Sequence, residues 1–296
     1  MTLHFERVAG PYAGTTCGLA WDGAGMLFSL LDENRILRFD PRTGETTEVR
    51  RHTNRTSGLA IGPDGTLYGC QESGRKIIRF LKDGSATPLA YKLDGAFHNQ
   101  PHDVTIGRSG RLWFADTRGE RPVPGPQIFP LLDFSAVLRL ERMPNREWAI
   151  TRVTYDTKAP TAVLISDDEK TLYVADGTVH DQGPRTLRAY PVGPDGRVGL
   201  FNVLCTFGSD HRGAHRGVTG MCFNPAGQIV TCSGWKLSGP GPLISFLTPA
   251  GVVIEAHPFP ADMPMRCCFG DADLSSLYVT STDGCLYRAA STGRPG

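Results

Sequence analysis

The side chains best suited to chemistry recur at one position of a repeated segment of this sequence. In each segment this position lies four residues before an apolar anchor, and the six residues are Cys17, Ser57, His102, Thr161, Thr219 and Met265. A thiol beside an imidazole is a potential nucleophile, because the imidazole can remove the thiol proton. We therefore predict that Cys17 and His102 form a catalytic pair, with Asp103 fixing the tautomer of the imidazole ring.

Further polar residues near these positions are predicted to bind substrate. When a nucleophile attacks a carbonyl carbon, negative charge develops on the oxygen, and hydroxyl and guanidinium groups can stabilise it. Thr161, Thr219 and Arg266 are assigned this role, and Ser57 completes the floor of the pocket. Arg266 also requires an anionic partner in an apolar channel, either a substrate carboxylate or an acidic side chain.

The segments that carry these residues predict short antiparallel strands. Apolar and polar residues alternate over about four to eight positions and end at turns such as PDG, RSG and PAG. The six segments begin near residues 17, 57, 102, 161, 219 and 266. Each is too small to bury its own faces, so we predict an all-β fold, a six-bladed β-propeller of four-stranded antiparallel blades. Residues 1–296 are expected to form this single domain.

The N-terminal segment and three insertions also have predicted places in this fold. The segment HFERVAG at 4–10 is expected to supply the outer strand of the last blade, which removes exposed strand edges. Longer insertions fall at 118–135, 177–185 and 205–218. The first is rich in proline and apolar residues, and we predict that it folds over a channel mouth as a lid, with Glu120 as a substrate contact.

Composition narrows the class of ligand and the cellular location. A formal net charge of +1 without a basic stripe favours a small-molecule substrate and gives no reason to expect nucleic acid or a membrane as partner. No apolar run approaches the roughly 20 residues of a membrane-spanning helix. The start MTLHFERVAG does not resemble a secretory signal, so a cytoplasmic location is expected. The eight cysteines lack CxxC spacing, which favours reduced, buried thiols.

Several phrases of the sequence resemble one known family. These phrases are NQPHDVTIGRSGRLWFADTRG, SDDEKTLYVADG and GMCFNPAGQIV. They are similar to the gluconolactonase and regucalcin (senescence marker protein) family of six-bladed propeller lactonases. The resemblance extends from about Cys17 to Arg288. It implies a hydrolase with one divalent cation in the channel, held by Glu, Asn and Asp residues of the first, fourth and fifth blades. It also implies an Asn of the third blade that contacts substrate.

The family's functional residues are replaced in this sequence. The Glu, the fourth-blade Asn, the Asp and the third-blade Asn fall in turn on Cys17, Thr161, Thr219 and His102. Asn99, Pro101 and Asp103 do match the family pattern, and Asn99 is predicted to bind substrate. Because hard cations such as Ca²⁺ require oxygen ligands that include carboxylates, we predict no metal ion and no other cofactor.

The predicted function is a lactonase-like hydrolase that acts on a small cyclic ester without the family's cation. One alternative is a softer metal held by Cys17 and His102 together with loop histidines. These loop histidines are His98, His211 and His215. A second alternative is acid/base catalysis by His102 and Asp103 in a cyclase, isomerase or lyase. A third is a non-catalytic propeller that binds a small molecule, and the oligomeric state is left open.

Overall fold

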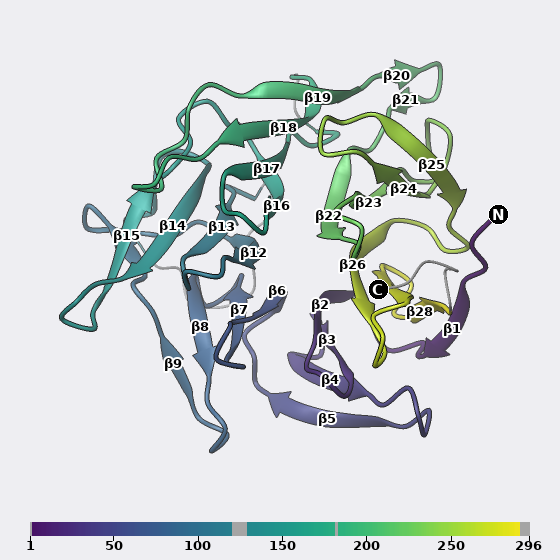
Figure 1. The fold of residues 1–296 in the computed structure, drawn as a ribbon, viewed down its shortest axis with the longest axis horizontal. Coiled ribbons are helices and arrows are strands. Elements are labelled where there is room, and N and C mark those ends of the chain that lie inside the picture. The colour runs from purple at the N-terminus through teal and green to yellow at the C-terminus, as the bar shows by residue number, and fades with distance from the viewer. Residues whose placement is uncertain (1, 120–128, 181–182, 291–296) are drawn as a thin grey trace.

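The computed structural model describes residues 2–119, 129–180 and 183–290. Within these ranges every regular element is a β-strand, and six four-stranded antiparallel sheets form the ring seen in Figure 1. The sheets are the blades of a six-bladed β-propeller, which confirms the predicted fold. In the part of the chain that is described, no helix is long and apolar enough to span a bilayer.

Blades 1 to 3 follow one another along the chain, and each begins with its inner strand. Blade 1 contains β2 (Thr16–Trp21), β3 (Met26–Leu30), β4 (Arg35–Phe39) and β5 (Thr46–Arg51). Blade 2 contains β6 (Thr56–Ile61), β7 (Leu67–Gln71), β8 (Lys76–Phe80) and β9 (Ala86–Pro88). Blade 3 contains β12 (Pro101–Ile106), β13 (Leu112–Asp116), β14 (Ala136–Arg142) and β15 (Trp148–Arg152).

Blades 4 to 6 repeat this pattern. Blade 4 contains β16 (Pro160–Ile165), β17 (Thr171–Asp176), β18 (Arg185–Pro191) and β19 (Asn202–Phe207). Blade 5 contains β22 (Val218–Phe223), β23 (Ile229–Ser233), β24 (Leu243–Leu247) and β25 (Val253–Pro258). Blade 6 contains β26 (Pro264–Gly270), β27 (Ser276–Ser281), β28 (Leu286–Ala289) and β1 (Glu6–Ala9). Two small hairpins lie between blades, β10 (Lys92–Leu93) with β11 (Ala96–Phe97), and β20 (Ser209–Asp210) with β21 (Gly213–Ala214).

The N-terminal strand completes the last blade. β1 pairs antiparallel with β28, so that Glu6 lies opposite Arg288, and Figure 1 shows the two strands side by side. This arrangement confirms the role predicted for the segment 4–10. It joins both ends of the chain in one sheet and covers a strand edge that would otherwise be free to pair with other chains.

Apolar side chains between neighbouring sheets hold the blades together. Tyr68 and Cys70 of blade 2 pack with Leu112 and Phe114 of blade 3 in one such cluster of buried residues. The alternation of side chains along each strand places every second residue against the adjacent blade. All eight cysteines lie in the described ranges as free thiols, and most of them are buried, as expected from the sequence.

The six positions selected from the sequence are structurally equivalent. Each is the second residue of an inner strand, namely β2, β6, β12, β16, β22 and β26. Every inner strand has a register shift near this point, and in blades 3 to 5 the shift leaves out His102, Thr161 and Thr219. In blade 1 it leaves out Gly18 instead, and Cys17 stays in the regular ladder. Because a β-bulge re-aims the side chain of the extra residue, this difference decides which residues face the channel.

Candidate active site

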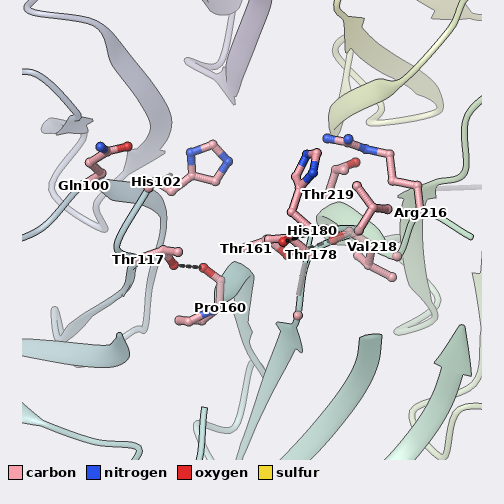
Figure 2. Close-up of a pocket in the computed structure, with 14 residues that line it drawn as sticks. Gln100, His102, Thr117, Pro160, Thr161, Thr178, His180, Arg216, Val218 and Thr219 are labelled. Carbon is pink, nitrogen blue, oxygen red and sulfur yellow. Dashed lines mark hydrogen bonds between the residues drawn. The ribbon is translucent and has the colours of Figure 1, made fainter. Parts of the chain in front are cut away.

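A cavity of about 280 Å³ lies at the channel mouth where the inner strands begin. Blade 3 supplies Gln100 and His102 to its wall, and blade 4 supplies Thr161 and His180. Blade 5 supplies Thr219, and Arg216 comes from the segment just before β22. In Figure 2, Gln100 and His102 lie on one side, and His180, Arg216 and Thr219 lie on the other. The cavity is near the lower end of the size range of small-molecule sites.

His102 is held by a carboxylate that the sequence analysis did not select. Its Nδ1 lies 2.9 Å from Oε1 of Glu72, which follows β7 and is buried. Burial raises the pKa of Glu72, but the hydrogen bond and charge of His102 and the charge of Arg55 outweigh burial, and the pKa is lowered. Because an ionised carboxylate can only accept a hydrogen bond, Nδ1 of His102 carries the proton. In the neutral ring, Nε2 is then the free base.

Arg55 extends this pair into a network that joins blades 1, 2 and 3. Its Nε lies 3.5 Å from Oε2 of Glu72, and its Nη1 donates to Oδ1 of Asp32 at 2.5 Å. The backbone N–H of Glu72 donates to the carbonyl of Arg55 at 3.1 Å, which fixes the carboxylate beside the guanidinium. The network therefore positions Glu72 from two directions, and Glu72 in turn orients the His102 ring.

Arg266 lies below the cavity wall and is buried. Its Nε lies 3.1 Å from Oδ1 of Asp103, and its guanidinium also donates to the carbonyl oxygens of His102, Met265 and Thr219. Burial disfavours the guanidinium charge, but Asp103 together with the thiols of Cys17, Cys232 and Cys70 outweighs this effect, and the pKa of Arg266 is raised. Asp103 is thus the anionic partner that the sequence required for Arg266. Arg266 is not among the cavity-lining residues and connects blades 3, 5 and 6 instead.

Asp103 does not hold the His102 ring, contrary to the sequence-based hypothesis. Its Oδ1 faces Arg266, and its Oδ2 accepts the backbone N–H of Val163 in the next blade at 3.0 Å. Asp103 and His102 are consecutive in β12, but the bulge in this strand falls on His102. The two side chains therefore have different partners, Arg266 for Asp103 and Glu72 for His102. Glu72 therefore takes the orienting place that was assigned to Asp103.

Cys17 is fully buried and is not among the described residues that line the cavity. It packs with Leu31 and Met265, and burial raises the pKa of its thiol. Among the described residues no hydrogen bond joins Cys17 to His102. A thiol with a raised pKa and no contact with a base is a poor nucleophile. The geometry does not support the predicted catalytic pair, because the bulge that would expose Cys17 falls on Gly18.

The hydroxyl groups of Ser57, Thr161 and Thr219 link neighbouring blades. The Oγ of Ser57 donates to the carbonyl of His102 at 2.8 Å. In the same way, Thr161 donates to Val218 at 2.9 Å, and Thr219 donates to Pro264 at 2.6 Å. These hydroxyl protons are therefore used within the protein. Thr161 and Thr219 line the cavity, and their oxygens can still accept hydrogen bonds from a ligand.

The remaining predicted substrate contacts lie away from the cavity or outside the described residues. Asn99 is buried, and its side-chain amide donates to Oδ2 of Asp116 and to the carbonyl of Phe134. It supports the loop before β12 and does not line the cavity. Glu120, with half of the predicted lid at 118–135, lies outside the described residues. The insertions at 177–185 and 205–218 do reach the cavity, through residues such as His180 and Arg216.

The residues at the family's cation position do not fit a hard divalent ion. Cys17 is buried against Leu31 and Met265 and does not line the cavity. Thr161 and Thr219 line the cavity but provide no carboxylate. Nor does the structure bring the loop histidines together: His98 is fully buried against Phe114, His211 is exposed, and His215 lies 3.5 Å from Asp210. In the described ranges no group of three or more His, Cys, Asp or Glu residues could hold a metal ion.

Glu72 and Arg216 are the main residues that sequence reasoning missed. Counting along inner strands cannot find them, because Glu72 follows the second strand of blade 2 and Arg216 precedes β22. A signal was nevertheless present. In an antiparallel blade the second strand ends at the mouth where the inner strand begins, so a charged residue just after that strand lies beside the cavity.

Comparisons with known proteins agree with this architecture. A family model described as SMP-30/Gluconolactonase/LRE-like region matches residues 16–283. A 6-deoxy-6-sulfogluconolactonase of Pseudomonas putida is 27% identical over 256 residues, which cover 84% of this chain and 76% of that protein. The structure of a gluconolactonase from Xanthomonas campestris has a TM-score of 0.79 and 25% identity, covering 97% of this chain and 90% of that one. The calcium-binding protein regucalcin from Agrobacterium tumefaciens, at 18% identity and a TM-score of 0.74, covers 97% and 93% and shares the fold.

Proposed function

Because this chain belongs to the SMP-30/gluconolactonase/LRE-like family, we propose that it is a hydrolase that opens a small sugar lactone, with His102 as the general base. The observation that carries this proposal is the 2.9 Å contact between Nδ1 of His102 and Glu72 at the wall of the cavity. Two similar proteins are named for gluconolactones, which supports a lactone of about that size as substrate.

The His102–Glu72 pair supplies a route to lactone hydrolysis from this chain's own residues. Glu72 keeps the proton on Nδ1, so Nε2 takes a proton from a water molecule as its oxygen attacks the lactone carbonyl carbon. Negative charge then develops on the former carbonyl oxygen. When the tetrahedral intermediate collapses, the bond from carbon to ring oxygen breaks, and Nε2 returns its proton to that oxygen. The products balance as one hydroxy acid from one lactone and one water.

Glu72 contributes to this route through charge as well as geometry. During catalysis His102 becomes an imidazolium, and a buried carboxylate in hydrogen-bond contact stabilises that charge strongly because little water screens it. Arg55 limits the cost of keeping Glu72 ionised inside the protein. The pair therefore resembles the His–carboxylate part of a hydrolytic triad, with water in the place of the serine. No step of this route needs a metal ion.

The proposal is tested with purified protein and a panel of five- and six-membered sugar lactones. Ring opening is followed as acid release, corrected for spontaneous hydrolysis, after dialysis against a chelator. We expect turnover without added metal and incorporation of one oxygen from ¹⁸O-labelled water. His102→Asn should lower kcat by about 10²- to 10⁴-fold. Activity that disappears on chelation and returns with a divalent cation, or a product formed without water, would contradict this mechanism.

A further inference from the structure

Arg216 presents a positive charge to the cavity, and no carboxylate in the described ranges forms an ion pair with it. It lines the cavity on the side opposite His102, as Figure 2 shows, and it is partly buried. Among the described residues no salt bridge reaches its guanidinium, and its buried Nε has no hydrogen-bond partner. Cζ of Arg216 lies 5.8 Å from the ring centroid of Trp235, a contact that holds the guanidinium in place without neutralising it.

Two other buried arginines of this chain have carboxylate partners, whereas the buried Arg75 and Arg185 donate to backbone carbonyl groups. Arg266 pairs with Asp103 at 3.1 Å, and Arg188 pairs with Asp176 at 2.9 Å. Burial lowers the pKa of Arg216, and the carboxylate of Asp262 opposes this effect. Asp262 is not paired with Arg216, because its Oδ1 accepts two backbone N–H groups. A guanidinium that is taken out of water without a counter-ion carries a desolvation cost that a bound anion would relieve.

No described residue of the cavity wall carries a negative charge. Of its described lining residues, the only ones with ionisable side chains are His102, His180 and Arg216, and none is Asp or Glu. A cleft that contains a fixed positive charge and no acidic lining residue concentrates ligands of negative charge. The cavity is therefore complementary to an anion and unfavourable for a free cation.

We propose that Arg216 binds an anionic substituent of the substrate, so that the preferred substrate is a sugar lactone with a carboxylate or sulfonate group remote from its ring carbonyl. This inference rests on the proposed lactonase function. The lactone carbonyl lies at His102 and the anionic end at Arg216, because the two side chains face each other across the cavity. A guanidinium fork binds either oxyanion through two N–H groups, which a lysine or a neutral side chain cannot do.

The test compares two lactones that differ at one carbon, the neutral glucono-1,4-lactone and the carboxylate-bearing glucaro-1,4-lactone. The wild-type protein should have a kcat/KM at least about 10-fold higher for the anionic lactone. Arg216→Gln should lower kcat/KM for that lactone by about 10- to 100-fold, the range expected for loss of a charged hydrogen bond, and leave the neutral one nearly unchanged. Arg216→Lys should retain part of the preference. A 6-sulfonate lactone in the same assay identifies which oxyanion fits better.

Arg212→Gln is the matched control, since it removes the same charge from the same segment. Arg212 is exposed, pairs with Asp210 and is not among the lining residues, so this variant should keep the preference for the anionic lactone. Equal kcat/KM for both lactones in the wild-type protein, or an equal loss on both in Arg216→Gln, would overturn the anion site while leaving the hydrolase intact. If Arg216→Gln does not fold, the proposal is tested by the ratio of kcat/KM for the anionic and the neutral lactone in the wild-type protein and in Arg216→Lys.

A binding measurement separates this inference from the proposed function. The ring-opened dicarboxylate glucarate and the monocarboxylate gluconate are titrated into wild-type protein and Arg216→Gln by calorimetry. Tighter binding of glucarate that is lost in the variant supports the anion site, even if no lactone is hydrolysed and the hydrolase proposal fails. If glucarate and gluconate bind equally, or if the variant binds glucarate as well as the wild type does, the anion site is refuted.

Discussion

Oε1 of Glu72 and Nδ1 of His102 lie 2.9 Å apart, although 30 residues separate them in the chain. The contact joins the end of the second strand of blade 2 to the bulge at the start of blade 3. In the proposed mechanism this contact fixes the tautomer of the imidazole ring and places a stabilising negative charge beside it. This relationship provides the most direct test of the proposed mechanism.

Replacing Glu72 with Gln should lower kcat by about 10- to 100-fold, with a smaller effect on KM. The amide keeps the size of the side chain but removes the negative charge that stabilises the imidazolium form of His102. Steady-state kinetics on the best lactone of the panel provide the measurement. Glu33→Gln is a suitable control, because Glu33 also pairs with an arginine but its contacts are with Arg35 and the backbone of Ala13 rather than with His102. If Glu72→Gln retains full kcat, Glu72 does not assist His102.

Cys17→Ala should leave kcat and KM within about twofold of the wild-type values. The thiol is buried with Leu31 and Met265, and its pKa is raised by burial. The loss of packing should lower the free energy of unfolding by about 1 kcal/mol, as for other small deletions in a core. Kinetics and urea denaturation of the same preparation check both values. A variant that folds normally but has lost turnover would restore Cys17 as a nucleophile.

The fold and the register of the inner strands could be predicted from the sequence, because both depend on the periodic alternation of apolar and polar residues. The rule of four residues before an anchor places each selected residue second in its inner strand. It could not show that the bulge of β2 falls on Gly18 while the bulge of β12 falls on His102, since this choice depends on how neighbouring blades approach. The Cβ of any other residue at position 18 would lie 2.2 Å from the carbonyl oxygen of Ser57.

Contacts across blade boundaries do not follow from the position of a residue within its own strand. The hydroxyl of Thr219 has the chemistry of an oxyanion donor, yet its proton is used on the carbonyl of Pro264 in the next blade. Asp103 directly follows His102, yet its charge is directed at Arg266, which lies more than half the chain away. Adjacency in sequence therefore misidentified the carboxylate that serves His102. The correct one, Glu72, required knowledge of which strand ends meet at the channel mouth.

The Asp103–Arg266 pair is expected to stabilise the fold and not the chemistry directly. Breaking a buried pair leaves an uncompensated charge, so Asp103→Asn and Arg266→Gln should each lower the free energy of unfolding by about 3 to 5 kcal/mol. The double variant should be less destabilised than the sum of the two, because it leaves no lone charge behind. Urea denaturation of the three variants measures this coupling. Strict additivity of the two losses would show that the pair has no energetic significance.

We expect His98 to make the stability of the protein sensitive to acid. The ring is buried against Phe114 at a centroid distance of 5.2 Å, and neither of its nitrogens has a hydrogen-bond partner. Burial lowers its pKa to about 3. The folded protein therefore keeps His98 neutral, whereas the unfolded chain takes up a proton below about pH 6.5. As the pH falls from about 6.5 towards 3, this residue lowers the free energy of unfolding by up to about 1.4 kcal/mol per pH unit.

His98→Phe should remove this contribution and, at pH 7, raise the free energy of unfolding by about 1 to 3 kcal/mol, because a desolvated polar ring is replaced by an apolar one. The contribution of Asp116 to the free energy of unfolding has the opposite pH dependence. Burial raises its pKa to about 7, so this contribution is lost as the pH rises from about 4 to 7.

Because Asp116 is present in both proteins, the quantity to compare is the difference in free energy of unfolding between variant and wild type, measured by urea denaturation from pH 7 to 5. This difference should grow on acidification for His98→Phe. A constant difference for His98→Phe would mean that the buried ring is protonated in the folded protein as readily as in the unfolded chain.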